Sequence, residues 1–145
     1  MGSEMCIRDS SYPENSHTED YRQEVLNLVN AQRAKYGLTA LEMGDDNLTA
    51  AAQTRAEEIA VVNSHVRPDG SKCFTVLKDY GVTDTPTGEN AAWGSVSPEE
   101  VVNAWMNSEG HRANILNPEA RKMSVGYYYN SNSTWGHQWI QIFTK

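Results

Sequence analysis

The last segment of this chain most constrains its fold, because the segment is apolar on both of its sides. Side chains of a β-strand point alternately to the two faces of a sheet. Trp139, Gln141 and Phe143 would point to one face. Ile140 and Ile142 would point to the other. A strand that is apolar on both faces has to be covered on both, so we predict helices on both faces of a sheet.

The segment before it has the pattern of a partner strand. Val125, Tyr127 and Tyr129 alternate with other residues, and a turn rich in serine and asparagine follows at 130–134. Alternation of this kind on either side of a turn favours an antiparallel hairpin. The stretch 81–96 has the composition of a loop, and we predict a loop there.

Helical spacing or end signals mark four other segments. The predicted helices cover about 18–36, about 45–63, about 71–80 and a segment that begins at residue 97. The fourth has the clearest start, because Ser97 can cap it, Pro98 suits its first position and Glu100 completes a capping box.

Length and charge limit the classes of protein to consider. The 145 residues are enough for one domain and too few for two. A net charge of −7 and an isoelectric point near 5.0 disfavour a nucleic-acid partner. We expect residues 1–17 to form a disordered, tag-like tail and residues 18–145 to form a single domain, present as a monomer and without a transmembrane segment.

Three polar segments at loops or helix ends carry the candidate site residues His65, Glu89 and His111. Neutral imidazoles and a carboxylate are common ligands of zinc-like cations, and three protein ligands leave one position open for water or substrate. Each residue also has an ordinary structural interpretation, as a capping histidine or a solvated glutamate. Cys73 is expected to be a small buried side chain rather than a nucleophile.

Several longer stretches occur in an order typical of one family. They are LNLVNAQRAKYGLTAL, the segment around His65, GENAAW, VVNAWMNSEGHRANILNP, VGYYY and QWIQIF, and together they span about residues 20–144. The chain resembles the CAP superfamily of cysteine-rich secretory, antigen 5 and pathogenesis-related proteins, and within it the cysteine-poor, secreted bacterial branch. The resemblance implies an α+β fold, a three-layer α-β-α sandwich with a central, mainly antiparallel sheet. It also implies a secreted, extracellular protein, whose signal peptide would be missing from this chain.

The same resemblance implies a site in which two histidines and two glutamates face a shallow cavity. Three of these positions match His65, Glu89 and His111. The fourth falls on Ser108, with Glu109 one residue later, and one step along a helix turns a side chain by about 100°. We therefore predict a metal site of three ligands, His65, His111 and Glu89, with Glu109 as a further carboxylate at the rim of the cleft.

Three functional hypotheses follow from these residues. The first is an extracellular binding module whose cleft holds a divalent cation, with zinc favoured over magnesium or copper, and takes a lipid, a sterol or a cell-surface ligand. The second is a metal-assisted hydrolase of the peptidase kind in which Glu89 moves protons. The third is a polar cluster that only stiffens loops. We favour binding, and expect no established catalytic activity, because the sequence shows no dedicated nucleophile and no oxyanion hole.

Overall fold

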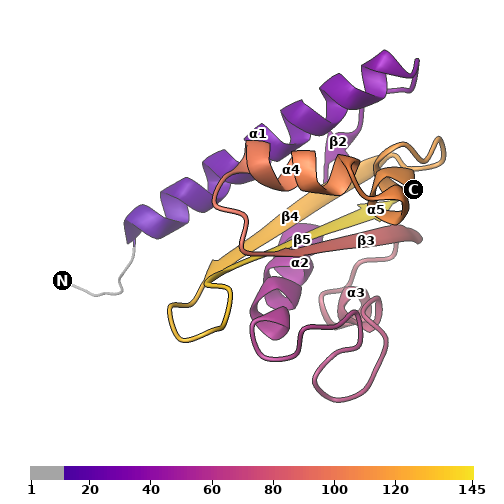
Figure 1. Ribbon diagram of the computed structural model, residues 1–145. Helices are drawn as coiled ribbons and strands as arrows, with labels where there is room; N and C mark the ends of the chain where they lie inside the picture. The colour runs from indigo at the N-terminus through magenta and orange to yellow at the C-terminus, as the bar shows by residue number, and fades with distance from the viewer. Residues whose placement is uncertain (1–11) are drawn as a thin grey trace.

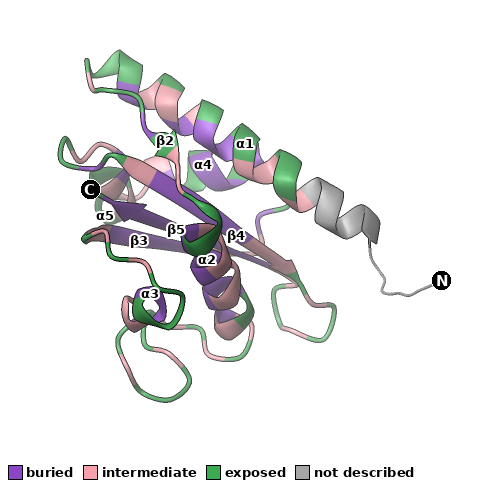
Figure 2. Cartoon of the chain, turned by 180° about the vertical axis from the view of Figure 1, so that it is seen from behind, coloured by how far each residue is buried: buried purple, intermediate pink, exposed green. Residues whose placement is uncertain are grey.

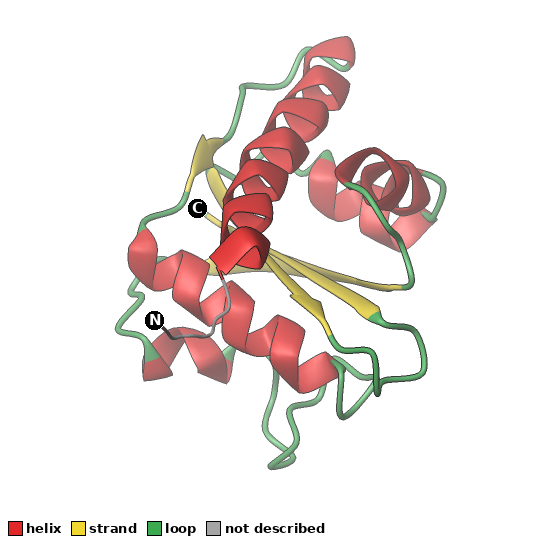
Figure 3. Ribbon diagram, turned by 90° about the vertical axis from the view of Figure 1, so that its left-hand side faces the viewer, coloured by secondary structure: helices red, strands yellow, loops and turns green. Residues whose placement is uncertain are grey.

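The structure is a computed structural model that describes the backbone of residues 12–145 and the side chains from Thr18 onward. Residues 1–11, which belong to the predicted tail, lie outside the described part. Three layers are visible when the molecule is viewed along its sheet, with strands between two layers of helices (Figure 3). The predicted α+β class and the α-β-α sandwich are confirmed.

The central layer is a four-stranded sheet in the order β2-β4-β5-β3 (Figure 1). Its strands are β2 (Glu42–Met43), β3 (Pro86–Trp93), β4 (Lys122–Tyr129) and β5 (His137–Thr144). The pairs β4 with β5 and β3 with β5 are antiparallel, and the short β2 runs parallel to β4. The predicted C-terminal hairpin and the mainly antiparallel sheet are therefore confirmed.

One face of the sheet is covered by α1 (Tyr12–Lys35), α4 (Pro98–Met106) and α5 (Glu109–Ile115). Trp139 and Phe143 of β5 are fully buried on this side. Burying large aromatic side chains between a sheet and its helices is the main stabilising contribution of such a layer.

The opposite face is covered by α2 (Asp46–Ile59) and α3 (Thr75–Asp79). Ile140 and Ile142 of β5 are fully buried there, so the two-sided final strand has the environment that its sequence predicts. Figure 2 shows the purple, buried colour of the strands and of the inner side of α2, in contrast to the mostly green and pink outer loops. Helix α2 lies so close to β4 that a Cβ atom at Gly126 would collide with the backbone of Ala52.

Helix ends follow the local signals where those signals are strong. Ser97 Oγ accepts a hydrogen bond from Glu100 N at 3.1 Å, and Glu100 Oε1 accepts one from Val96 N at 3.0 Å. Asp45 Oδ1 caps α2 by accepting from Leu48 N at 2.9 Å. The predicted starts of α2 and α4 are therefore confirmed.

Other boundaries differ from the prediction. Helix α1 begins at Tyr12 rather than near residue 18, and α2 and α3 are shorter than the predicted 45–63 and 71–80. The prediction of a loop over 81–96 is wrong, because β3 lies within it. Pairing with β5 along its length, rather than local propensity, makes this segment a strand.

Candidate functional site

The candidate site lies at β3, the strand at one edge of the sheet. Glu89 lies in the middle of β3, His65 in the segment after α2, and His111 in α5 (Figure 1). His65 Nδ1 and Glu89 Oε1 are 2.7 Å apart. An ionised carboxylate only accepts hydrogen bonds, so His65 Nδ1 carries a hydrogen and donates a hydrogen bond to Glu89 Oε1.

The other partner of Glu89 is Arg55, a residue of α2 that sequence reasoning did not select as part of the site. Arg55 Nε donates to Glu89 Oε2 at 2.9 Å, and Arg55 Nη2 donates to Glu89 Oε1 at 3.1 Å. The Arg55 side chain is completely buried, and only 2% of the Glu89 side chain is exposed. This bidentate contact is the strong, geometrically specific form of an arginine–carboxylate pair.

Arg55 also holds the segment that carries His65. Its Nη2 donates to the carbonyl oxygen of Ser64 at 3.1 Å, and its Nη1 pairs with Glu58 at 2.8 Å. Arg67, two residues after His65, pairs with Glu58 and with Asp79 of α3, both at 2.7 Å. The residues on both sides of His65 are therefore tied to α2 and α3, so the imidazole is presented from a fixed backbone.

Helix α5 brings His111 to the same edge of the sheet through an asparagine network. Asn90 Nδ2 donates to the His111 carbonyl oxygen at 3.1 Å, and Asn114 Nδ2 donates to Asn90 Oδ1 at 2.8 Å. Gly88 permits this approach, since a Cβ atom there would collide with the Asn114 side chain. Asn114 thus occupies the outer edge of β3 where a further strand would otherwise pair.

The charges of these groups shift one another's pKa values. The hydrogen bond to Glu89 raises the pKa of His65, against the opposing effects of burial and of the Arg55 charge. Burial alone would raise the pKa of Glu89, but hydrogen bonds from His65 and Arg55 outweigh it and lower that pKa. Burial, and then the charge of His65, lower the pKa of His111. The charge of His65 therefore reaches His111, whose backbone carbonyl is held against β3 by Asn90.

The chain is similar to a known protein family over most of its length. The family model described as "CAP: Cysteine-rich secretory protein family" matches residues 26–143. This chain belongs to the CAP family. The resemblance expected from the sequence motifs is confirmed.

Two bacterial relatives of this CAP chain come from Bacillus subtilis (strain 168). The chain is 41% identical over 127 residues to "Uncharacterized protein YkwD", and the match covers 86% of this chain and 49% of that protein. It is 33% identical over 115 residues to "Uncharacterized membrane protein YlbC", covering 76% of this chain and 33% of that protein. The chain therefore spans half or less of the length of these relatives.

Solved structures with the same fold include two from other bacteria. An extracellular protein containing a SCP domain from Bacillus anthracis str. Ames matches with a TM-score of 0.80 and 24% identity, over 93% of this chain and 44% of that one. An outer surface protein from Borrelia burgdorferi matches with a TM-score of 0.69 and 25% identity, over 85% of this chain and 90% of that one. Both are described as proteins of the cell exterior or surface.

Glu109, the remaining predicted site residue of this CAP domain, makes none of the contacts described above. Glu109 is the exposed first residue of α5, and its carboxylate has no hydrogen bond to any other side chain that the structure describes. Ser108 precedes it as the N-cap, without a side-chain capping bond. Hydrogen bonds therefore join His65 and Glu89 to Arg55, whereas His111 is linked to β3 through its backbone carbonyl and Asn90, and Glu109 takes part in neither set of contacts.

The three residues do not form a ready metal site. Among the side chains of residues 18–145, no group of three or more histidines, cysteines, aspartates or glutamates is arranged to hold a metal ion. Both carboxylate oxygens of Glu89 already accept hydrogen bonds from Arg55, and one also accepts from His65. Glu89 is therefore placed to orient His65 rather than to act as a third ligand.

Cys73 and two tryptophans near β3 have structural roles. Cys73 is buried beside Glu89, and burial raises the pKa of its thiol to about 11, as expected for an unreactive cysteine. Trp105 is buried in the core, where its Nε1 donates to the Ala91 carbonyl at 3.0 Å. Trp93 Nε1 donates to the Ile59 carbonyl at 3.0 Å.

Proposed function

We propose that this CAP domain is an extracellular binding module whose ligand contacts the two imidazoles of His65 and His111. The observation that carries the proposal is the Arg55–Glu89–His65 chain of hydrogen bonds. It uses a buried ion pair to fix the orientation of an imidazole whose side chain is 54% exposed. A side chain held this firmly and still open to solvent is suited to contact a ligand.

A divalent cation, zinc above all, is the ligand class that best suits these nitrogen donors. A histidine that binds a metal through one ring nitrogen usually donates its other N–H to a carboxylate, which fixes the tautomer. His65 donates to Glu89 in this manner, so its Nε2 keeps the lone pair. In this proposal His65 and His111 would hold the ion, Glu89 would orient His65, and water or an external ligand would complete the coordination.

The same contacts favour binding over hydrolysis. A general base works best with a pKa near the working pH. The pKa of Glu89 is instead lowered, by hydrogen bonds that outweigh its burial, and its oxygens are occupied by Arg55. We therefore expect no hydrolysis of casein by the zinc-loaded protein. Casein hydrolysis by the wild type that disappears in Glu89→Gln would instead favour the hydrolase hypothesis over the binding hypothesis.

The extracellular location rests on relatives that are described as extracellular or outer-surface proteins. No helix in residues 12–145 has the length and the apolar character needed to cross a bilayer. The proposal also includes a lipid, a sterol or a cell-surface molecule as the natural partner, and a monomeric state.

Calorimetric titration with Zn²⁺ at pH 7.5 tests the proposal. The wild type is expected to bind one ion, and His65→Ala or His111→Ala to lose this binding. Glu89→Gln, which removes the orienting carboxylate, should weaken binding by about 10–100-fold. His137→Ala is the matched control, because the His137 ring is engaged by the Tyr127 hydroxyl at 2.6 Å and lies outside the site. A wild type without zinc binding, or equal losses in all three histidine variants, would refute the proposal.

A further inference from the structure

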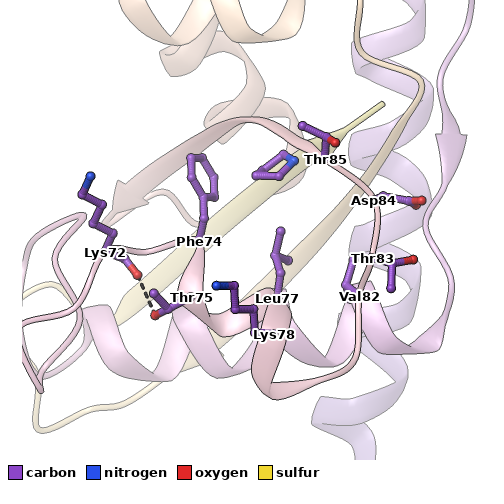
Figure 4. Close-up of a pocket in the computed structure, with 10 residues that line it drawn as sticks. Lys72, Phe74, Thr75, Leu77, Lys78, Val82, Thr83, Asp84 and Thr85 are labelled. Carbon is purple, nitrogen blue, oxygen red and sulfur yellow. Dashed lines mark hydrogen bonds between the residues drawn. The ribbon is translucent and has the colours of Figure 1, made fainter.

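A second candidate binding site lies beside α3 and contains none of the residues discussed so far as ligands. It is a pocket of about 410 Å³ between α3 and the segment 82–86 (Figure 4). This volume lies within the range of about 300–1,000 Å³ that is usual for small-molecule sites. We call it the α3 pocket.

The inner wall of the α3 pocket is apolar. Phe74, Leu77, Val82 and Pro86 contribute to its lining. Leu77 is almost completely buried, and Val82 packs against the same core cluster, so the wall is continuous with the core between α2 and the sheet. An apolar molecule that entered the pocket would remove this wall from water.

The pocket is formed in advance by backbone hydrogen bonds. Gly81 adopts a left-handed φ of 72° and ends α3, and Val82 N then donates to the Leu77 carbonyl at 2.8 Å. Lys145 N donates to the Thr85 carbonyl at 2.9 Å, which ties the far end of the segment to the end of β5. A ligand would therefore not have to order this wall when it binds.

The charged residues of the pocket give it a local positive character, although the chain as a whole is acidic. Lys72, which precedes α3, and Lys78, which lies within it, both line the pocket and are exposed (Figure 4). Neither ammonium group forms an ion pair or a hydrogen bond with any residue in the described part of the chain. The carboxylate of the pocket, Asp84, is paired with Lys122 at 3.2 Å, a residue outside the lining. Two lysines are thus left without a partner beside an apolar wall.

We propose that the α3 pocket binds a small amphipathic carboxylate, with the apolar body against Phe74, Leu77 and Val82 and the carboxylate beside Lys78 and Lys72. The apolar wall supplies most of the binding free energy, and the lysines select an anionic over a neutral ligand. This site is separate from the histidine site and does not depend on the proposed function.

Titration of ¹⁵N-labelled protein with octanoate, followed by ¹H–¹⁵N NMR in zinc-free buffer, tests the inference. We expect saturable shifts of backbone amides within residues 72–86. The Lys72→Gln, Lys78→Gln double variant should weaken octanoate binding by about fivefold, which corresponds to two exposed ion pairs. It should leave binding of the neutral analogue 1-octanol unchanged. Lys35→Gln, an exposed lysine in the last turn of α1, is the control and should bind octanoate like the wild type.

A second variant separates the pocket from a general effect of charge. Thr85 is exposed and lines the pocket, so Thr85→Trp should fill the opening and abolish binding of both octanoate and 1-octanol without disturbing the core. The inference is overturned if octanoate shifts no amide within 72–86, if Thr85→Trp binds octanoate normally, or if the lysine variant weakens both ligands equally.

Discussion

Replacement of Arg55 by methionine tests whether its buried ion pair holds the site together. The substitution keeps an unbranched apolar stem and removes the guanidinium group, which makes two hydrogen bonds to Glu89 and one each to Glu58 and Ser64. Glu89 would then keep a buried carboxylate without the positive charge of Arg55, while its contact with His65 remains.

Removing one partner of a buried ion pair costs about 3–5 kcal/mol, because the other charge is left without compensation. Taking about 4 kcal/mol and an m-value of about 2 kcal/mol per molar urea, the midpoint of urea unfolding should fall by about 2 M. Tryptophan fluorescence can follow the transition, since Trp105 and Trp139 are buried in the folded protein. Arg112→Met is the control, because Arg112 is exposed, and its unfolding free energy should stay within about 0.5 kcal/mol of the wild type.

A double-mutant cycle makes the reasoning specific to the pair. Glu89→Gln removes the charge that Arg55 compensates, so the double variant should be less destabilised than the sum of the two single variants, with a coupling of about 1–3 kcal/mol. A loss below about 1 kcal/mol in Arg55→Met, or additive losses in the cycle, would show that the ion pair does not organise this part of the fold.

The remaining predictions concern titration and reactivity. In ¹H–¹³C NMR spectra His65 should titrate at higher pH than His111, and Glu89→Gln should lower the pKa of His65, because the hydrogen bond to Glu89 is the main cause of its raised value. Since the pKa of His65 is raised in the folded state, the stabilisation from His65 is fully present below about pH 6.5 and is lost as the pH rises through the folded-state pKa. If His111 instead titrated at higher pH than His65, the assigned contacts would be contradicted. Cys73, with a pKa of about 11, should escape iodoacetamide at pH 8 in the folded protein and react in urea, as measured by peptide mass mapping, and equal labelling in both states would argue against its burial.

The parts of the fold that the sequence predicts well are those with strong local signals. The two-sided pattern of Ile140 and its neighbours identifies β5, and the cap at Ser97 identifies the start of α4. Strand β3 carries no such signal, because Gly88, Glu89 and Asn90 have low strand propensity, and the segment becomes a strand only through its pairing with β5.

The sequence predicts only part of the candidate site, and the missing part depends on the same strand. The family motifs identify His65, Glu89 and His111, whereas none of them includes Arg55. A signal for it exists, because Arg55 lies between Ala51 and Ile59 on the buried side of α2. A charged residue in the middle of an apolar helix face predicts a buried partner of opposite charge. The identity of that partner depends on how β3 pairs, which is the element that local reasoning misses.

The position of Asn114 against β3 has a consequence for association between molecules. An exposed strand edge offers unpaired backbone groups to a strand of another chain, and this is a common route to aggregation. Here the Asn114 amide reaches both the Glu89 carbonyl and the Asn90 side chain, and Gly88 leaves room for it. Any strand that tried to extend the sheet at this edge would first have to displace α5, so the same helix that carries His111 also blocks strand addition at β3.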